Sequence, residues 1–261
     1  MINCSNNYNS QTFRDFEIKS QKYTVRLALN REEVEKALRL RFYVFNVELG
    51  EGLDESYSKK LDEDCYDKFC HHLIIIEHAT NEVIGTYRIQ DSDSAREGFG
   101  FYTENEFDLS NFPEFIKTNA FELGRACIDM NHRNGRVLYM LWKGLAKYMI
   151  LSNKRYLFGC CSITSQNPDE GRAIYEYLKQ GNYIDANYFA NVTPDFECLT
   201  LSSELGYNQK VEIPQLFKLY LELGCKVCSP PALDKDFKTI DFLILLDIDS
   251  ISKETRALFL K

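Results

Sequence analysis

The sequence lacks any apolar run that approaches the roughly 20 residues a helix needs to cross a bilayer, although 44% of its 261 residues are hydrophobic. Its first twenty residues are polar, without the basic flank and apolar stretch of a secretory signal. We therefore expect a cytoplasmic protein of globular composition, with residues 1–20 as a flexible N-terminal arm.

Positive charge is also scarce. The chain carries 31 Lys and Arg residues against 39 Asp and Glu residues, which gives a net charge of -8. An excess of negative charge argues against general binding of nucleic acid, whose phosphates attract a basic surface. We expect no nucleic-acid partner.

The nine cysteines are odd in number and scattered through mostly apolar segments, which is typical of reduced thiols. Cys225 and Cys228 form a Cys-x-x-Cys pair. A zinc site needs a second ligand pair, and the only candidates lie far upstream. A redox pair normally opens a helix, whereas Pro230 and Pro231 follow here. We interpret both cysteines as small buried residues and expect no metal site.

Neither repeats nor low-complexity tracts nor a linker divide the chain, and its length suffices for a sizeable core. We predict one α/β domain over residues 21–261, with an insertion near 181–212. Apolar periodicity predicts strands over 23–29, 71–78, 83–90, 121–128, 156–164 and 239–247. It predicts helices over 31–48, 136–151, 169–180, 213–223 and 252–260, the first of them capped by Asn30.

The most informative segment is Glu122-Leu123-Gly124-Arg125, which lies in an apolar strand. A carboxylate and a guanidinium in a buried strand break the rule that charges stay out of cores. Strict alternation puts the two side chains on opposite faces of the sheet. A bulge at Gly124 would re-aim one of them. Two charges brought into one crevice of a sheet indicate a functional site, or else a structural ion pair.

Two further arginines lie in apolar elements. Arg41 falls on the apolar stripe of the first helix and needs a buried anionic partner, unless its guanidinium snorkels to solvent. Arg88 ends the strand over 83–90. The carboxylates available to these arginines and to Arg125 are those of Asp64, Asp67 and Glu122.

Four short motifs occur in order, and together they resemble the signature of acyl-homoserine-lactone synthases. They are Arg41-Phe42-Tyr43-Val44-Phe45, Asp64-Cys65-Tyr66-Asp67, Gly85-Thr86-Tyr87-Arg88 and Glu122-Leu123-Gly124-Arg125. The chain resembles more closely the amino-acid N-acyltransferases that make the lyso precursors of ornithine and glycine lipids. The shared details, spread over roughly residues 23–260, are Glu48-Leu49-Gly50, Leu141 to Ala146, Phe158-Gly159-Cys160, Pro230-Pro231-Ala232 and Thr239 to Phe242.

This resemblance implies an N-acetyltransferase-like (GNAT) α/β fold, in which a mixed central sheet is splayed at a bulge and flanked by helices. It implies transfer of a 3-hydroxyacyl group from acyl carrier protein to the α-amine of an amino acid such as ornithine or glycine. The product would be a lyso-aminolipid for membrane lipid biosynthesis. The phosphopantetheine-linked acyl donor is then a substrate, and no bound cofactor is expected. Peripheral contact with the inner face of the membrane stays open, because the product is a single-chain lipid.

The implied site has two catalytic candidates. We expect Glu122 to hold the acceptor ammonium and take its proton, with Asp67 as the second candidate. Substrate-binding roles fall to Arg41, Phe45, Asp64, Arg88 and Arg125, and the division of labour among the three arginines stays open. Backbone N–H groups freed by the bulge would stabilise the thioester oxyanion.

The donor is expected to bind at the start of the helix over 136–151. Coenzyme A users of this superfamily carry a glycine-rich turn there, whose N–H groups cradle a diphosphate. Here Arg133 to Leu138 keeps only the first glycine, Gly135. The bulkier Val137 and Leu138 crowd a diphosphate, which favours a carrier protein with its single phosphate. Its acidic surface would meet a basic patch, for which the candidates are Arg133, Gly135, Arg136, Lys143 and Lys147.

Two alternatives remain at this point. An acyl-homoserine-lactone synthase would take S-adenosylmethionine as acceptor, but residues 181–261 exceed what those smaller enzymes carry. A non-catalytic binder of acyl carrier protein or lipid would not need the charged motifs. The acceptor amino acid stays open too: ornithine would want an additional carboxylate in the pocket, and Glu104, Glu106 and Asp108 are candidates.

Overall fold

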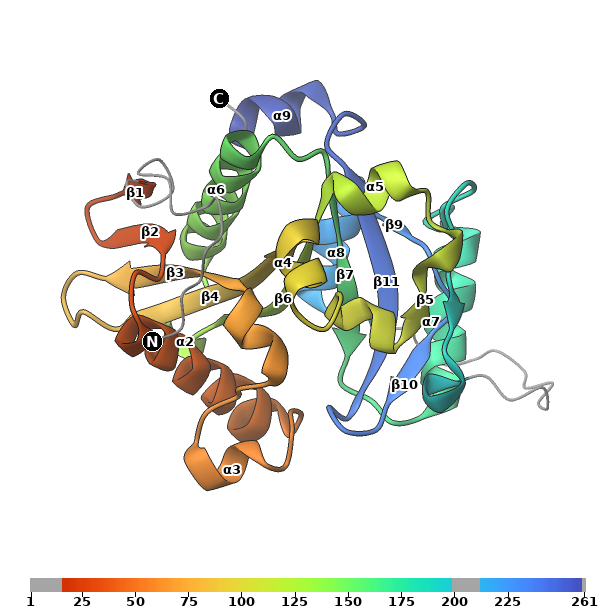
Figure 1. Ribbon diagram of the computed structural model, residues 1–261, viewed down its shortest axis with the longest axis horizontal. Helices are drawn as coiled ribbons and strands as arrows, with labels where there is room; N and C mark the ends of the chain where they lie inside the picture. The colour runs from red at the N-terminus through yellow and green to blue at the C-terminus, as the bar shows by residue number, and fades with distance from the viewer. Residues whose placement is uncertain (1–15, 199–211, 260–261) are drawn as a thin grey trace.

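A nine-stranded mixed sheet organises the described part of the chain, which comprises residues 16–198 and 212–259 of a computed structural model (Figure 1). The strand order is β1-β2-β3-β4-β6-β7-β11-β10, with β9 also paired to β11. The β6–β7 pair is parallel and the other pairs are antiparallel. The strands are β1 (Glu17–Lys19), β2 (Tyr23–Leu27), β3 (His71–Glu77), β4 (Val83–Asp91), β6 (Ala120–Ile128), β7 (Tyr156–Ile163), β9 (Lys226–Val227), β10 (Ala232–Asp234) and β11 (Thr239–Asp247).

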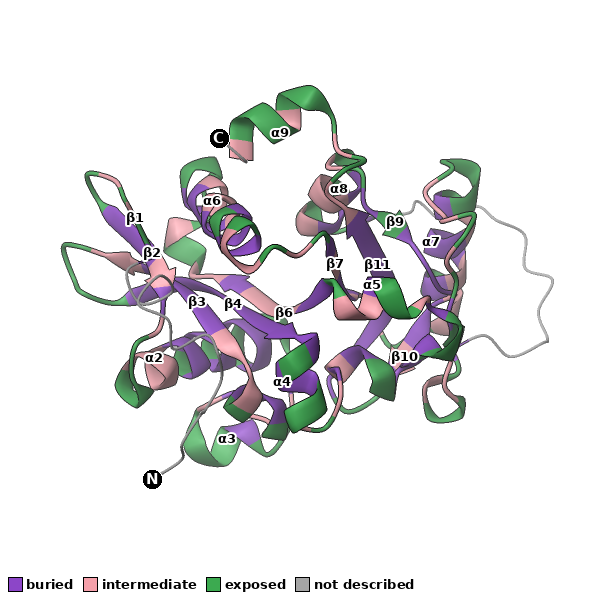
Figure 2. Ribbon diagram, turned by 45° about the horizontal axis from the view of Figure 1, so that its top comes forward, coloured by how far each residue is buried: buried purple, intermediate pink, exposed green. Residues whose placement is uncertain are grey.

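Helices cover both faces of this sheet (Figures 1 and 2). One face carries α2 (Arg31–Phe42) over β3 and β4, and the segment 92–119 over β7 and β11. That segment contains α4 (Ser92–Glu97), the 3₁₀ turn η4 (Tyr102–Asn105), β5 (Phe107–Asp108), the turn η5 (Leu109–Asn111) and α5 (Glu114–Thr118). The other face carries α6 (Gly135–Ser152), α7 (Pro168–Gln180), α8 (Gln215–Glu222) and α9 (Lys253–Phe259).

The first helix starts as the sequence predicts and changes character before its end. The Asn30 side chain accepts a hydrogen bond from the Glu33 N–H at 3.0 Å, which is an N-cap. After Phe42 the helix continues as the π-helical segment η2 (Tyr43–Leu49). Such segments often mark functional sites. The acidic loop that follows contains α3 (Ser56–Lys59) and the 3₁₀ turn η3 (Cys65–Phe69).

One expectation needs correction, at the N-terminal end of the predicted domain. Residues 16–19, expected within a flexible arm, join the sheet through β1, because Phe16 is only 1% exposed and packs in the core between α6 and the sheet. Residues 1–15 lie outside the described residues, as do 199–211 of the expected insertion. The described part of that insertion contributes β8 (Asn191–Val192), which pairs with β5. Cys225 and Cys228 are buried free thiols, as predicted.

The sheet splits between β6 and β7. These strands pair only from Ala120 opposite Tyr156 to Glu122 opposite Phe158. Beyond Glu122 the described strands share no further pair, so the edge of β6 that faces β7 is left open. Mixed sheets that part in this way leave a cleft bordered by unpaired backbone groups. The splay therefore begins at Glu122.

A bulge lies just past that point, on the other edge of β6. Residues 86 and 88 of β4 pair with residues 127 and 124 of β6, so one residue of β4 faces two of β6, Arg125 and Ala126. The sequence predicts the bulge at Gly124, but Gly124 stays in the ladder and the left-handed residue is Arg125, with φ of 49°. A non-glycine residue adopts this conformation at some cost, which the contacts of the Arg125 side chain offset.

Candidate active site

Arg41 is the centre of a buried ion-pair network. Its side chain is 0% exposed. Its Nε donates to Asp62 at 2.7 Å, and its two other nitrogens donate to Asp67 at 2.6 and 3.2 Å. Burial alone would raise the pKa of Asp67, but the Arg41 and Arg88 guanidinium groups together outweigh burial and lower that pKa. Arg41 therefore fixes the loop over residues 62–67 against α2.

The other two arginines meet at Asp64. Arg88 donates to Asp64 at 2.6 Å, and Arg125 approaches the same carboxylate oxygen at 3.3 Å. Burial opposes ionisation of Asp64, but the two guanidinium groups outweigh it and lower its pKa. Arg125 also lies 3.4 Å from Asp62, yet its Nε makes no hydrogen bond. Its guanidinium is held between aromatic rings, 4.8 Å from the centre of Tyr102 and 4.2 Å from that of Phe237.

Glu122 lies at the closed end of the splay and receives three hydrogen bonds. The backbone N–H groups of Tyr102 and Thr103 donate to its two oxygens at 2.9 and 2.6 Å, and the Thr103 hydroxyl donates as well. Glu122 is 5% exposed, and burial raises its pKa, although these hydrogen bonds oppose the rise. Because Arg125 lies over the Tyr102 ring, the bulge brings Glu122 and Arg125 to the same side of the sheet, as the sequence predicts.

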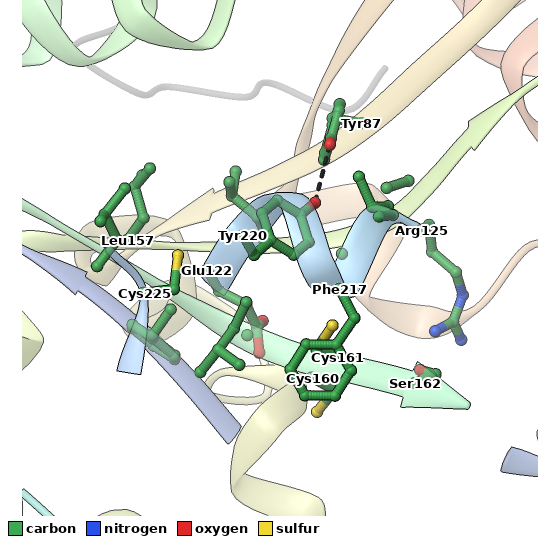
Figure 3. A pocket seen from close by; sticks show the side chains of 18 of the residues that line it. Tyr87, Glu122, Arg125, Leu157, Cys160, Cys161, Ser162, Phe217, Tyr220 and Cys225 are labelled. Atoms are coloured by element: carbon green, nitrogen blue, oxygen red, sulfur yellow. Dashed lines mark hydrogen bonds between the residues drawn. The ribbon is translucent and has the colours of Figure 1, made fainter. Parts of the chain in front are cut away.

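A cavity of about 370 Å³ passes through the sheet at the splay (Figure 3). On the α2 face it is lined by Glu122, Arg125, Arg88, Tyr102 and Phe237. On the α6 face its lining is mainly apolar and comprises Trp142, Leu145, Met149, Phe217, Tyr220, Ile244 and Leu246. Backbone of β6 from Leu123 to Ala126 forms part of the wall between the two regions. The cavity thus joins a charged region to an apolar one.

The apolar region contains one polar group of three side chains. The Trp142 indole N–H donates to the Tyr87 hydroxyl at 3.2 Å, and the hydroxyls of Tyr87 and Tyr220 lie 2.8 Å apart (Figure 3). Burial raises the pKa of Tyr87 to about 12, so this hydroxyl keeps its proton at neutral pH. All three residues line the cavity.

A second acidic group adjoins the charged region. Glu106, Asp234 and Asp241 are each at most 3% exposed, and their carboxylate oxygens lie within 4.8 Å of one another. Asp234 and Asp241 line the cavity, as does Glu51. Burial raises the pKa of Asp241 to about 6 and that of Glu106 well above its usual value. This arrangement has the donor set for a cation, whether a metal ion or an ammonium group.

The start of α6 borders a second cavity of about 640 Å³. Arg133 and Gly135 line it, and the Asn134 side chain caps the helix by accepting from the Val137 N–H. Arg133 forms a two-pronged ion pair with Glu48. The two cavities share Phe45, Leu49, Tyr87, Ala126, Trp142, Leu216 and Phe259. The second cavity, at the helix terminus, therefore adjoins the first one at the splay.

The basic residues proposed along α6 do not all face this route. Arg136 is exposed, Lys143 lies 5.5 Å from the centre of the Tyr139 ring, and Lys147 lies 5.9 Å from that of Phe16. Phe16 precedes β1, so Lys147 adjoins the first strand and not the second cavity. Arg136 and Lys143 remain next to the cavity residue Tyr139.

The structure separates the predicted site residues into two sets. Phe45, Arg88, Glu122 and Arg125 line the first cavity. Arg41, Asp64 and Asp67 do not line it: Arg41 pairs with Asp67, and Asp64 pairs with Arg88 and Arg125. The outer arginines of the ion-pair network, Arg88 and Arg125, therefore line the cavity. The centre of the network, at Arg41, has a structural role.

Several residues of the site were not predicted. Asp62, the second partner of Arg41, lies in a loop with many other carboxylates and carries no distinguishing signal. The sequence carries no signal for four further residues either, and only the fold brings them to the cavity: Glu51, Tyr102, Asp234 and Tyr220. Asp241 did carry a signal, because it is a charge within the apolar strand over 239–247. Of the three candidates Glu104, Glu106 and Asp108, only Glu106 is buried.

Residues 40–143 match the family model described as an acetyltransferase (GNAT) domain. Together with the mixed sheet that parts at β6 and β7, this match defines the class: the chain is an acyltransferase with the α/β GNAT fold. No helix in the described ranges has the length and apolar character needed to cross a membrane.

Within that class the chain is related to the L-ornithine N(alpha)-acyltransferases. It is 29% identical to the one from Brucella abortus (strain 2308) over 240 residues, which cover 87% of this chain and 85% of that protein. It is 28% identical to the one from Rhodobacter capsulatus over 246 residues, 91% of this chain and 94% of that protein.

Solved structures that resemble the chain include the AHL synthase LasI, with a TM-score of 0.47 and 14% identity over 91% of this chain and 94% of that one. They also include FeeM, an N-acyl amino acid synthase from uncultured soil microbes, with a TM-score of 0.45 and 10% identity over 87% of this chain and 92% of that one.

Proposed function

We propose that the protein is an amino-acid N-acyltransferase that moves a 3-hydroxyacyl group from acyl carrier protein to the α-amine of an acceptor of the ornithine or glycine type. The product is a lyso-aminolipid. The observation that carries this proposal is the cavity through the sheet, which has Glu122 and Arg125 at one end and an apolar lining at the other. One end suits a small zwitterion and the other suits a fatty acyl chain.

The acyl chain occupies the apolar region between α6 and α8. Burial of each methylene there contributes about 0.8 kcal/mol, which favours a long chain. The hydrogen-bonded group of Trp142, Tyr87 and Tyr220 provides a partner for the hydroxyl at C3 of the acyl chain. Trp142, Tyr87 and Tyr220 bring three donor hydrogens, but only two hydrogen bonds join them among the described residues. One phenolic O–H is therefore left over and faces the cavity, where a chain hydroxyl can accept it.

The acceptor binds on the α2 face. Arg125 has an unused Nε donor and a cavity-facing guanidinium, so it binds the acceptor carboxylate, with Arg88 beside it. Glu122 holds the α-ammonium at the point where β6 and β7 part. The acceptor nitrogen then lies at the junction between the two regions, which is where the thioester carbon must be for attack.

The transfer itself is a direct substitution. Glu122 takes a proton from the ammonium, directly or through water, because only the neutral amine is nucleophilic. The nitrogen bonds to the thioester carbon, and β6 N–H groups left unpaired by the splay stabilise the oxyanion. The C–S bond then breaks and the phosphopantetheine thiolate leaves, and it takes up the second proton that the nitrogen loses as the amide forms. No cysteine nucleophile is required.

Glu122 is a better base than Asp67 for two reasons. Glu122 lines the cavity, whereas Asp67 is locked to Arg41 and does not. The pKa of Glu122 is raised by burial toward neutrality, and that of Asp67 is lowered by Arg41, which makes Asp67 a weak base. We assign Asp67, with Arg41, to positioning the loop that carries Asp64.

The carrier protein docks at the start of α6, where the second cavity admits the phosphopantetheine arm. Arg133 and Gly135 line this cavity, and Arg136 and Lys143 lie beside its residue Tyr139. Lys147 lies apart from it, next to Phe16, and at most adds to the long-range positive field. Exposed charge pairs of this kind contribute at most about 1 kcal/mol each, so they guide a transient partner and do not hold it tightly.

The test is to incubate the purified protein with 3-hydroxypalmitoyl acyl carrier protein and each standard amino acid plus ornithine, and to detect N-acyl products by mass spectrometry. The same acyl group on coenzyme A is the matched donor. One dominant N-acyl amino acid, formed faster from the carrier protein, is expected. Absence of product with every acceptor, while the carrier still binds, would contradict the proposal.

A further inference from the structure

Three buried carboxyl groups beside the acceptor end of the cavity have no role in the transfer described above. Glu106 follows η4, Asp234 ends β10 and Asp241 lies in β11. They come from distant parts of the sequence and meet because β11 pairs with both β7 and β10. Asp234 and Asp241 reach the cavity, and Glu106 lies behind them.

No basic side chain in the described part of the chain forms an ion pair with these carboxyl groups. The three arginines of the site are paired with Asp62, Asp64 and Asp67. Among residues 16–198 and 212–259, no ion pair involves Glu106, Asp234 or Asp241. An unpaired buried carboxylate costs several kcal/mol, so the trio must either bind protons or receive a cation from outside.

The trio is also incompletely hydrogen-bonded. Within the described residues, neither oxygen of Glu106 and only one oxygen of Asp241 accepts a hydrogen bond of ordinary geometry, although Glu106 is 1% exposed. The nearest polar neighbours of these oxygens are the Cys160 thiol, the Ser162 hydroxyl and the two carboxyl groups themselves. Asp234 is oriented by the N–H groups of Asp236 and Phe237 at 2.9 and 2.8 Å. Fully buried oxygens left without donors, next to an open cavity, indicate a binding site for a donor-rich cation.

The trio is linked to Glu122 by one residue. The Tyr102 hydroxyl donates to Asp234 at 3.2 Å, while its backbone N–H donates to Glu122 at 2.9 Å. The two acidic sites therefore lie at the two ends of a single tyrosine. An acceptor whose α-ammonium lies at Glu122 and whose carboxylate lies at Arg125 would direct its side chain along Tyr102 toward the trio.

We propose that Glu106, Asp234 and Asp241 form a subsite for the side-chain ammonium of a diamino-acid acceptor, so that the enzyme selects acceptors with two amino groups. This inference rests on the proposed function. An ammonium group brings three donors to oxygens that lack them. A hard divalent metal takes six to eight oxygens, whereas here one Asp234 oxygen is already bound to two backbone N–H groups.

The experiment compares ornithine with norvaline, which has the same carbon skeleton without the side-chain amine. We expect kcat/KM for ornithine to exceed that for norvaline by about 100-fold or more, because unpaired buried polar groups reject the analogue. In Glu106→Gln and Asp241→Asn, the ratio of the two kcat/KM values should fall by about 100-fold. Glu114→Gln, which changes an exposed carboxylate of α5, is the matched control and should leave the ratio unchanged.

Each of the following outcomes would contradict the proposed ammonium subsite. A wild-type enzyme without preference for ornithine, or variants that lower both kcat/KM values equally, would contradict it while the acyltransferase function stands. Activity lost to a chelator and restored by Mg²⁺ or Ca²⁺ would make the trio a metal site instead. If no amino acid is acylated at all, calorimetric titration with ornithine and norvaline decides the question without turnover, and equal affinities would contradict the subsite.

Discussion

Gly159 of β7 packs so closely against Leu123 of β6 that a Cβ on Gly159 would stand 2.2 Å from the Leu123 carbonyl oxygen. This contact lies one residue beyond the last β6–β7 pair, Glu122 opposite Phe158. It closes the narrow end of the splay and so determines where the cavity begins. The obstacle is backbone, so no change of rotamer can relieve it.

Gly159→Ala should therefore force β6 and β7 apart. We expect a loss of about 1–3 kcal/mol in the free energy of unfolding, measured by chemical denaturation, and a loss of acyl transfer. Gly124→Ala is the control, because a Cβ there would meet the Arg88 guanidinium only at 3.8 Å. It should change stability by less than about 1 kcal/mol. Equal stability of both variants and the parent would show that the contact is not limiting.

Glu122→Gln should lower the rate of acyl transfer by about 10²–10⁴-fold at neutral pH. Because the carboxylate also accepts from Tyr102 and Thr103, a loss of rate alone does not distinguish a base from a structural anchor. The dependence of the rate on pH distinguishes these two roles. Without a base only the free amine reacts, so the variant's rate should rise about tenfold per pH unit below the pKa of the acceptor amine. A variant profile parallel to that of the parent would exclude the base role.

Tyr220→Phe should reduce discrimination between acyl chains. We assign Tyr87 as the donor to Tyr220, which leaves the Tyr220 O–H as the spare donor for the C3 hydroxyl, and the variant removes that O–H. We expect the preference for 3-hydroxypalmitoyl over palmitoyl donors to fall about tenfold, which corresponds to one hydrogen bond of about 1.4 kcal/mol. Competition between the two donors measures this ratio. Tyr177→Phe, at an exposed position of α7, should retain it, and an unchanged ratio in Tyr220→Phe would exclude the assignment.

Asp241→Asn should alter how stability depends on pH. Burial raises the pKa of Asp241 to about 6, so the folded state takes up a proton that the unfolded state binds only near pH 4. The parent therefore gains stability from this group as the pH falls from 7 to 4, and the full penalty is present above pH 6. The neighbouring carboxyls Glu106, Asp234 and Glu51 remain in the variant.

Denaturation at pH 7.5 and 4.5 checks this expectation. The difference in free energy of unfolding between Asp241→Asn and the parent should favour the variant at pH 7.5 by on the order of 1–3 kcal/mol more than at pH 4.5. The exposed Glu114→Gln should show no such dependence. A constant difference between Asp241→Asn and the parent would mean that the carboxyl is not strained by burial.

The charged motifs could be found from the sequence because charges in apolar elements are conspicuous. Arg41, Arg88, Glu122 and Arg125 each stand out in this way. The structure brings Arg88, Glu122 and Arg125 to one cavity and places Arg41 in the adjoining ion-pair network. The position of the bulge was one residue off. Glycine is the expected left-handed residue, but the ion pairs and ring contacts of Arg125 outweigh its local preference.

The acidic subsite could not be assembled from the sequence. Glu106 was one of three candidates in a polar segment, and only the packing of η4 against β7 and β11 decides which of them is buried. Asp234 and Asp241 follow Glu122 by more than a hundred residues and reach the site through antiparallel pairing of β11 with β7. Local periodicity carries no information on such long-range pairing.

The opening between β6 and β7 gives access to the site from both faces of the sheet. In the reaction proposed above, the two substrates reach the reacting atoms from opposite faces, so neither has to pass the other and both can be present at once. The proposed product differs from them, because its head group would lie on the α2 face and its chain between α6 and α8. It would pass through the opening between the strands. At the narrow end of this opening, Gly159 contacts Leu123, which blocks movement of the product within the plane of the sheet. The lipid must therefore be drawn out lengthwise, which makes its departure a step separate from the chemistry.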